Sequence, residues 1–381
     1  MGDYGKVVTG NTPPTKDIEN YENGTYLWAS PADLGIIKSI TETKTMLSAQ
    51  GFSKTRTLPK GSVLVTCIGS TIGKAGMATK EMSTNQQINS IVVNDDNDNE
   101  FVYYAIQSAF PRYLSSIAVQ AVPIISKSAF ELLPNNRPYL QEQKKIGKFL
   151  SLLDERIAAQ NKIIDKLQSL IKGLEDNLLD NPLWKKTYLR SFMQFFSTNS
   201  LSWEQLSYEE GEIRNLHYGL IHGFLTRGIN SASLPMIKNE ARPKQYTLCQ
   251  VGDVAFADAS EDTGEIAKSV EFVDTIEGDT ICGLHTIHGR DIKNRTVVGF
   301  KGFAFNSRYF HNQIKRLAQG TKVFSITANN LSSCYVYLPD LETQKAIVNL
   351  LKTYEAKLLV SKRLLEHYEK QKQYLLRQMF I

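Results

Sequence analysis

The sequence has few cysteines, and none of them are close together. Its four cysteines, Cys67, Cys249, Cys282 and Cys334, form no Cys-x-x-Cys pair, so neither a disulfide scaffold nor a zinc finger is indicated, and no metal site is predicted. No segment approaches the ~18 consecutive apolar residues of a membrane span. The first residues lack the basic and apolar regions of a secretory signal. The expected location is therefore the reducing cytoplasm, with no membrane partner.

Neither sign of charge dominates the chain. Its 381 residues include 44 Lys and Arg and 39 Asp and Glu, which gives a formal net charge of +5. This mildly basic balance permits nucleic-acid binding but does not establish it. Hydrophobic residues make up 42% of the chain, so the composition is that of a globular protein. The length predicts two or three domains.

An internal repeat is the most informative feature of the sequence. Pro138–Ile146 (PYLQEQKKI) matches Pro339–Ile347 (PDLETQKAI) at an offset of 201 residues. A looser match aligns Lys60–Val63 (KGSV) with Val251–Val254 (VGDV). Because the two matches occur in the same order, they predict a duplicated unit of about 200 residues.

Each unit is expected to consist of a strand-rich globule followed by a long helix. Val63–Val65 and Val297–Phe300 are short runs typical of β-strands, and each prolonged stretch of strong helix formers begins after a proline. A lead-in at Leu201–Leu206 has no evident counterpart in the first unit, which predicts a shorter N-terminal edge there. The expected segments are a first globular domain at residues 1–139, a first long helix at 140–181, a second domain at 182–340 and a second long helix at 341–381.

Apolar residues in both long helices recur at alternating steps of three and four, which is the heptad pattern of a coiled coil. Gln160 and Ser361 are polar seam positions. If the helices pair antiparallel, end to end, these two residues face each other, which costs less than a polar residue facing leucine. Antiparallel pairing is therefore favoured over packing of each helix on its own globule. The seam comprises Leu150, Leu153, Ile157, Gln160, Ile164, Leu167, Ile171, Leu351, Tyr354, Leu358, Ser361 and Leu365.

Several ordered motifs accompany the repeat. They are Gly10–Thr15, Trp28–Leu34, Ile68–Lys74, Arg214–Gly219, Gly283–Ile287 and the helix starts at Gln143 and Gln344. In combination, and over nearly the whole chain, they resemble the specificity subunit of a type I restriction-modification system. The resemblance implies an α+β fold with two similar target recognition domains, which are strand-rich α/β globules separated by two long antiparallel coiled-coil helices in a pseudo-two-fold repeat.

The same resemblance implies a function without catalysis. Such a subunit recognises an asymmetric bipartite site in double-stranded DNA, with one half-site for each domain. It docks two methyltransferase subunits and, through the complex, restriction subunits. S-adenosylmethionine, Mg²⁺ and ATP are then expected on those partners, and no cofactor on this chain. The leading alternative is a non-catalytic protein-binding adaptor that oligomerises through its coiled coil.

Segments that partly match catalytic motifs lack essential residues. Thr12–Thr15 resembles the tetrad of amino-methyltransferases but has no aromatic residue to stack on a flipped base. Gly69–Ala75 resembles a phosphate-binding loop but is one residue short and has no Ser or Thr after the lysine. His285 and His288 are expected on opposite faces of one strand, so shared metal ligation is not expected. No catalytic residue is predicted, which favours a binding protein.

Polar loops are the candidates for contact with DNA. Asn and Gln side chains can read adenine edges in the major groove, and Arg or Lys can read guanine. Lys, Arg, Ser and Thr also bind phosphates. The candidates in the first domain are Thr12, Ser70, Thr71, Lys74, Asn85, Gln86 and Gln87. Those in the second domain are Arg214, His217, Tyr218, His222, Ser260, His285, Arg290, Lys293, Arg308 and Lys322.

Overall fold

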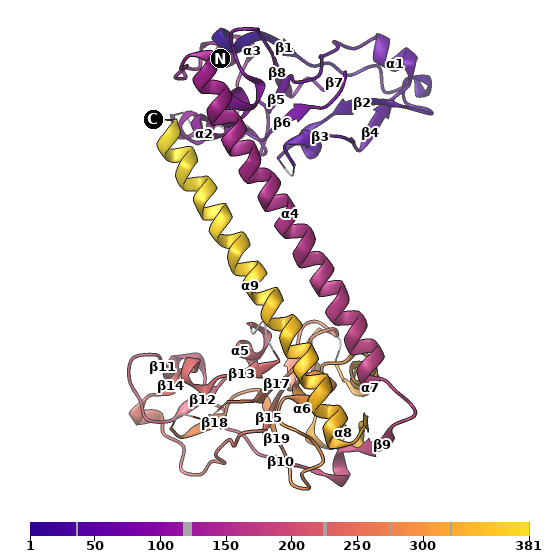
Figure 1. Ribbon diagram of the computed structural model, residues 1–381, viewed down its shortest axis with the longest axis vertical. Coiled ribbons are helices and arrows are strands. Elements are labelled where there is room, and N and C mark those ends of the chain that lie inside the picture. Colours follow the sequence, from indigo (N-terminus) through magenta and orange to yellow (C-terminus); the bar gives the residue numbers. More distant parts are fainter. Residues whose placement is uncertain are drawn as a thin grey trace. The chain divides into compact units, whose positions relative to one another are not determined.

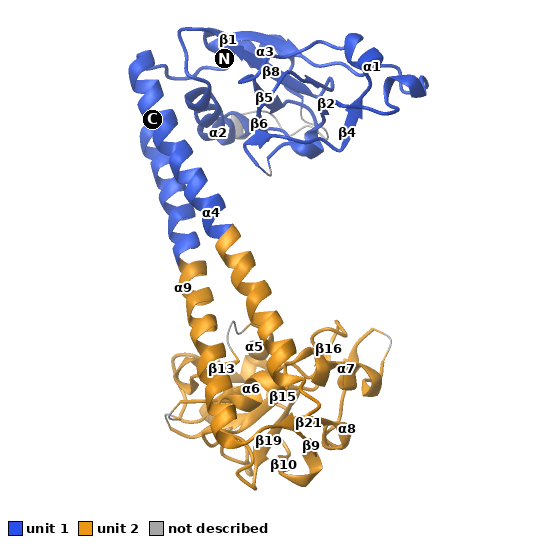
Figure 2. Ribbon diagram, turned by 45° about the vertical axis from the view of Figure 1, so that its right-hand side comes forward, with its two compact units in different colours: residues 1–161, 364–381 blue, residues 162–363 orange. Residues whose placement is uncertain are grey.

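A computed structural model describes residues 1–35, 37–116, 124–223, 227–274, 276, 278–320 and 322–380 of the protein. Contacts divide the chain into two compact units, coloured separately in Figure 2. The first unit comprises residues 1–161 and 364–381, and the second comprises residues 162–363. The two long helices, α4 (Leu140–Leu179) and α9 (Leu341–Met379), therefore each contribute to both units. Within the described residues, no helix has the length and apolar character needed to cross a membrane.

In its described residues, the globule of the first unit has two sheets and three α-helices (Figure 1). One sheet has the strand order β1 (Gly5–Thr9), β8 (Ile88–Val93), β5 (Val63–Thr66), β6 (Ala75–Ala78), β3 (Ser39–Ile40). The other has the order β4 (Thr45–Leu47), β2 (Tyr26–Ala29), β7 (Ser83–Thr84). The helices are α1 (Ala49–Ser53), α2 (Asn99–Ser116) and α3 (Lys127–Leu132). The central strand β5 is buried along its whole length, as its run of apolar residues predicts.

The part of the second unit that the structure describes has two larger sheets and two short strand pairs. The five-stranded sheet has the order β10 (Met193–Phe196), β19 (Thr286–Asp291), β15 (Val254–Ala257), β17 (Ser269–Phe272), β13 (Gly228–Ile229). The four-stranded sheet has the order β11 (Leu206–Ser207), β14 (Met236–Ile237), β12 (Arg214–Leu216), β18 (Thr280–Cys282). The pairs are β16 (Ala259–Ser260) with β20 (Phe324–Ser325), and β9 (Lys185–Tyr188) with β21 (Tyr335–Leu338). The helices are α5 (Tyr218–Gly223), α6 (Phe300–Ala304), α7 (Arg308–Leu317) and α8 (Ala328–Ser333).

The strand order confirms the duplication that the sequence predicts. The five-stranded sheets of the two units have matching strand orders, β1-β8-β5-β6-β3 in the first and β10-β19-β15-β17-β13 in the second. In addition, β2 pairs with β7 in parallel, as β12 does with β18. The looser sequence match is explained by a shared turn. Gly61 and Gly252, which precede β5 and β15, have φ angles of 85° and 90°, a left-handed conformation that glycine adopts without a steric penalty.

The stronger sequence match is explained by a buried glutamine at the start of each long helix. In the first unit, Gln143 Nε2 donates to Pro138 O and Gln143 Oε1 accepts from Asp98 N at 3.0 Å. In the second, Gln344 Nε2 donates to Pro339 O and Gln344 Oε1 accepts from Val297 N, also at 3.0 Å. The same side chain thus binds the helix start to a loop of its own globule.

Replacing Gln344 with leucine should destabilise the second unit. Leucine fills a similar volume but removes the partner of Val297 N and of the carbonyl oxygens of Arg295 and Pro339, all in partly buried surroundings, which costs roughly 1–3 kcal/mol. Urea unfolding monitored by circular dichroism measures the loss. Gln141→Leu, at an exposed position of α4, is the control and should leave the transition unchanged. Equal stability of both variants would show that the repeated glutamine does not hold the helix start.

The two long helices run antiparallel, as the sequence predicts. In the first unit, Asp154 in the first half of α4 forms an ion pair of 2.6 Å with Lys372 near the end of α9. In the second unit, the end of α4 shares a core with the beginning of α9, including Leu178 and Leu351. The α+β fold class, with two strand-rich globules and paired long helices, is confirmed.

The positions of the predicted heptad seam are shielded from solvent on both helices. Leu150, Leu153, Gln160, Ile164, Ile171 and Leu351 are buried, and the remaining seam positions are half-buried. The residues between them on both helices are mostly exposed. Direct pairing of Gln160 with Ser361 stays a prediction.

One local prediction is wrong. Val297–Phe300 is not a strand: Gly299 has a φ of 95° and caps α6, which begins at Phe300. Phe300 is buried at the start of this helix, whereas Val298 is exposed. A run of four residues is too short for its periodicity to distinguish the start of a helix from a strand. In the first unit β1 pairs with β8 over five residues, and in the second β10 pairs with β19 over four, but β9, which precedes β10, has no counterpart before β1. The shorter N-terminal edge of the first unit stays a prediction.

Acidic residues of both long helices meet in the second unit. Glu175 of α4 lies 3.8 Å from the Arg227 guanidinium, and Glu355 Oε1 of α9 accepts a hydrogen bond from Arg227 N. Burial raises the pKa of Glu175, and burial raises the pKa of Glu355 to about 7, against the attraction of Arg227. Glu175 and Glu355 thus both lie beside Arg227, where burial removes much of the water that would otherwise stabilise their negative charges.

This arrangement predicts that stability falls as the pH rises from about 4.5 to about 7. In that interval the folded protein keeps a proton on Glu355 that the unfolded chain has lost, so deprotonation favours unfolding. Glu355→Gln should remove the fall and raise the free energy of unfolding at pH 8 by roughly 1–3 kcal/mol. Urea unfolding at pH 5 and pH 8 measures it. Glu369→Gln, at an exposed site on α9, should leave the pH dependence as in the parent protein.

Candidate functional site

Three polar loops of the first unit meet at one end of its sheets. They follow β1, connect β5 to β6, and connect β7 to β8. Asn11 N donates to Thr84 O at 2.9 Å, Cys67 N donates to Gln87 O at 2.8 Å, and Thr12 Oγ1 donates to Gln86 Oε1. The structure therefore brings together the predicted candidates Thr12, Ser70, Thr71, Asn85, Gln86 and Gln87.

These candidates differ in what they can offer a ligand. Asn85 is buried and binds the backbone of Gln87 in a local turn, so it shapes the loop. Gln86, Ser70 and Lys74 are exposed, and Gln87 is half-buried. Their amide, hydroxyl and ammonium groups suit base edges and phosphates.

Sequence reasoning missed Arg56 in this group. Its side chain is exposed, its Nη1 donates to Thr9 O at 2.9 Å, and its backbone N donates to Asn11 Oδ1. Arg56 thereby lies beside the Thr12 loop with most of its guanidinium donors accessible. It is an isolated arginine in a loop, and no pattern in the sequence distinguishes it from other surface cations.

The second unit has an equivalent turn with different side chains. Gly283 N donates to Leu216 O, as Asn85 N donates to Ala29 O, and Asp258 N donates to His285 O, as Cys67 N donates to Gln87 O. Asn85–Gln87 therefore corresponds to Gly283–His285. Asp258 and His285 therefore occupy the places that Cys67 and Gln87 have in the first unit.

Aromatic and imidazole rings pack against one another at the Gly283–His285 turn of the second unit. His217 lies between Trp203 and Tyr218, with ring centroids 4.4 and 4.7 Å apart, and Tyr218 contacts His285 edge-on at 5.3 Å. Burial lowers the pKa of His217, and the neighbouring His285 lowers it further, so this imidazole is neutral near pH 7. His285, with a φ of 52°, precedes β19 and does not lie on it.

Carboxylates hold two of the imidazole rings at this place. His285 Nδ1 lies 3.1 Å from Asp258 Oδ1, and His222 Nδ1 lies 3.2 Å from Glu265 Oε2. Half of the His285 side chain remains exposed. The result is a pre-positioned aromatic and imidazole surface on which bases could stack or form hydrogen bonds.

Several predicted cations are engaged within the protein. Arg214 Nη1 donates to Ala232 O and Leu234 O. Arg290 forms a two-pronged ion pair with Asp253 at 2.7 and 2.8 Å. Burial alone would raise the pKa of Asp253, but the hydrogen bonds from Arg290 and His288 outweigh it and lower that pKa. Arg214 and Arg290 therefore have structural partners that the sequence did not reveal.

The predicted cation Lys293 does not lie with the rings of His217, Tyr218 and His285. β19 runs from Thr286 to Asp291, so His285 is at one end of the strand and Lys293 is beyond the other. Ser260 pairs with Phe324, which brings exposed Lys322 towards the Asp258 loop. Arg308 is exposed at the first turn of α7. Only some of the residues predicted to contact DNA in the second domain are thus close to the Gly283–His285 turn.

The segment that resembles a phosphate-binding loop has the wrong context for one. Gly69–Lys74 is the turn between β5 and β6, an antiparallel hairpin. A nucleotide-binding loop leads from a strand into a helix whose N-terminus faces the phosphates.

A family model for the type I restriction modification DNA specificity domain matches residues 1–169 and 283–369, more than half of the chain. The chain belongs to this family. The two matched regions include the equivalent turns at Asn85–Gln87 and Gly283–His285 as well as most of both long helices.

Curated relatives of this family are similar to parts of the chain. The type I restriction enzyme MjaIX specificity subunit of Methanocaldococcus jannaschii is 31% identical over 174 residues, 43% of this chain and 40% of the relative. The chain thus matches about two fifths of that protein's length. The MjaVIII specificity subunit of the same organism is 24% identical over 319 residues, 79% of this chain and 72% of the relative.

A solved structure shares the fold of the chain. The crystal structure of a type I restriction-modification system S subunit from M. genitalium aligns with a TM-score of 0.59 at 16% identity, covering 99% of this chain and 93% of that one. At this identity the likeness concerns the fold alone, including the duplicated globules and the long helices.

Proposed function

We propose that this chain is the DNA sequence-recognition subunit of a type I restriction-modification complex. The observation that carries the proposal is the pair of equivalent turns. The same scaffold presents Asn85, Gln86 and Gln87 in one unit and Gly283, Leu284 and His285 in the other. A repeated scaffold with different exposed groups suits recognition of two different half-sites, and so of an asymmetric bipartite sequence in double-stranded DNA.

In this proposal, different residues read the bases and bind the phosphates. Gln86 and Gln87 read base edges in the first half-site, where a glutamine can bind adenine through two hydrogen bonds. Arg56 and Lys74 bind phosphates beside them. In the second half-site His285 and Tyr218 provide the corresponding groups, with Lys322 nearby for a phosphate.

An apolar stripe on α4 supports the docking of partner helices. Phe149, Leu152, Ile163 and Leu170 are between 43% and 49% exposed and recur at spacings that place them on one face of the helix. Exposed apolar residues in such a row are typical of an interaction surface. We assign this face to the two methyltransferase subunits, through which restriction subunits join the complex.

The chain itself acts without catalysis in this proposal. S-adenosylmethionine belongs to the methyltransferase subunits, and Mg²⁺ and ATP belong to the partner subunits as well. What this chain contributes is the position of those subunits relative to a DNA sequence.

Methylome sequencing of the host with and without this chain tests the proposal. Methylation at one bipartite motif should be lost when the chain is deleted and should return when it is supplied on a plasmid. If no motif changes in a strain whose methyltransferase subunit is active, the proposed function is wrong.

A further inference from the structure

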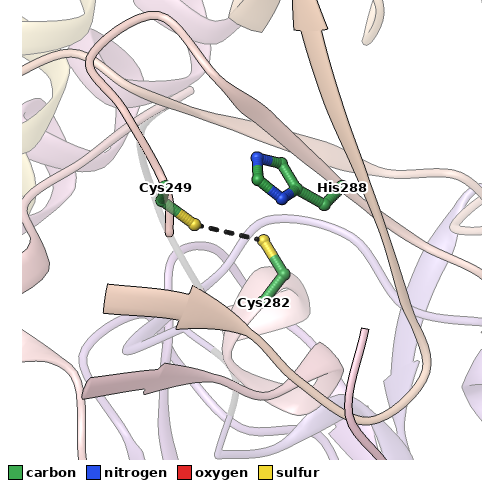
Figure 3. A group of neighbouring side chains, drawn as sticks. All are labelled: Cys249, Cys282 and His288. Carbon is green, nitrogen blue, oxygen red and sulfur yellow. Dashed lines mark hydrogen bonds between the residues drawn. The ribbon is translucent and has the colours of Figure 1, made fainter. Parts of the chain in front are cut away.

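Three side chains that commonly bind metals meet in the interior of the second unit (Figure 3). The ligand atoms of Cys249, Cys282 and His288 all lie within 4.8 Å of one another, and all three residues are buried. The two Sγ atoms are 3.6 Å apart. Two thiolates that bind one zinc ion at ~2.3 Å in tetrahedral geometry are separated by a similar distance. No sequence pattern indicates this group because the cysteines are far apart along the chain.

Asp253 holds the imidazole of His288 in the orientation that a metal ligand requires. Its Oδ2 lies 2.7 Å from His288 Nε2, and both side chains are only 1% exposed. Figure 3 shows the other ring nitrogen, Nδ1, on the side of the two sulfurs. A histidine that binds a metal through one nitrogen commonly donates its other N–H to a carboxylate, which fixes the tautomer and the ring.

The first unit shows that the scaffold does not need these residues. Leu58 N donates to Met82 O as Cys249 N donates to Thr280 O. The strand pairings of β5 with β8 and of β15 with β19 make Ser90 the equivalent of His288. The positions of Cys249, Asp253, Cys282 and His288 are occupied in the first unit by Leu58, Ser62, Thr84 and Ser90. Of the two repeats, therefore, only the second has at these four positions side chains that can bind a metal or support a metal ligand.

We propose that Cys249, Cys282 and His288 bind one Zn²⁺ ion, with Asp253 supporting the histidine. Binding replaces two thiol protons by one divalent cation, so two protons are released and the charge of the buried site does not change. A cavity of about 280 Å³ that is lined by Cys282, His288, Asn199 and Tyr246 adjoins the group. It has room for a water molecule as the fourth ligand.

The zinc ion holds the recognition turn of the second unit. Cys282 ends β18 and directly precedes Gly283, His288 lies on β19 just after the turn, and Cys249 precedes β15. One ion bound by all three fixes both ends of Gly283–His285 and ties the two sheets together. The first unit reaches the same backbone geometry without a metal, so the ion gives the second turn additional rigidity.

Metal analysis of the full chain, purified without a metal-binding tag and under reducing conditions, tests the proposal. Inductively coupled plasma mass spectrometry should find one zinc per chain in the parent protein and in Cys67→Ser, which removes a buried cysteine outside the group. Cys249→Ser with Cys282→Ser should lose at least ~90% of the zinc, and His288→Gln should bind it more weakly.

Cobalt substitution keeps the test valid if a variant fails to fold. The parent protein reconstituted with Co²⁺ should show a sulfur-to-cobalt charge-transfer band and the visible bands of tetrahedral coordination. A folded parent protein that takes up neither zinc nor cobalt would overturn the proposal. So would a Cys249–Cys282 disulfide in the reduced preparation, detected by thiol counting and mass spectrometry.

Discussion

Replacement of both Gln86 and Gln87 with alanine should abolish recognition of one half-site and leave the other unchanged. Both side chains belong to the turn that the first unit presents between β7 and β8, and Gln86 is exposed. Because one good bidentate interaction with a base contributes about 1–3 kcal/mol, methylation of the target should fall about 10- to 100-fold for each glutamine that no longer binds its base. Methylation rates of the reconstituted complex on the motif found by methylome sequencing measure the loss.

The matched control for this variant is Lys80→Ala. Lys80 is equally exposed but lies in the turn between β6 and β7, at the opposite end of β7 from Gln86. The complex that contains the Lys80→Ala variant should methylate the target at the parental rate. Parental activity of the double glutamine variant, or loss of specificity at both half-sites, would show that this turn does not read bases.

Lengthening both long helices by seven residues should change the spacer between the half-sites and leave the half-sites themselves unchanged. Seven residues keep the heptad seam in register and add ~10 Å at ~1.5 Å per residue. At ~3.4 Å per base pair, this corresponds to about three additional base pairs. Methylome sequencing of a host that carries the variant should therefore reveal the same two half-sites at a longer separation.

Both insertions are needed together because the helices are antiparallel. Seven residues added only to α4 would shift its seam against α9 and break interactions such as the Asp154–Lys372 ion pair. That single insertion is the control and should lower stability. Altered half-sites with an unchanged spacer in the double insertion would contradict a spacing role for the helices.

Sequence patterns were sufficient for features that depend on periodicity and repetition. The seam from Leu150 to Leu365 and the equivalent glutamines Gln143 and Gln344 were found in this way, because burial along a helix imposes steps of three and four residues. The Val297–Phe300 run shows the limit, since four residues carry too little periodicity to distinguish a strand from the start of a helix.

Individual site residues were less predictable because their partners are distant in sequence. Arg290 belongs to a basic run in the sequence, yet its guanidinium binds Asp253, which lies 37 residues earlier. Arg56 belongs to no pattern, yet its backbone and side chain bind the loop after β1. Which of two similar cations remains available to a ligand depends on these neighbours.

The duplication, the two long helices and their antiparallel seam can be predicted from the amino-acid sequence, because a repeat and a heptad are properties of spacing along the chain. The folded chain is needed to see that Asn85–Gln87 and Gly283–His285 are equivalent turns, and that Cys249, Cys282 and His288 meet. Those groupings arise from strand pairing between segments far apart in sequence, and pairing at such separation leaves no local pattern.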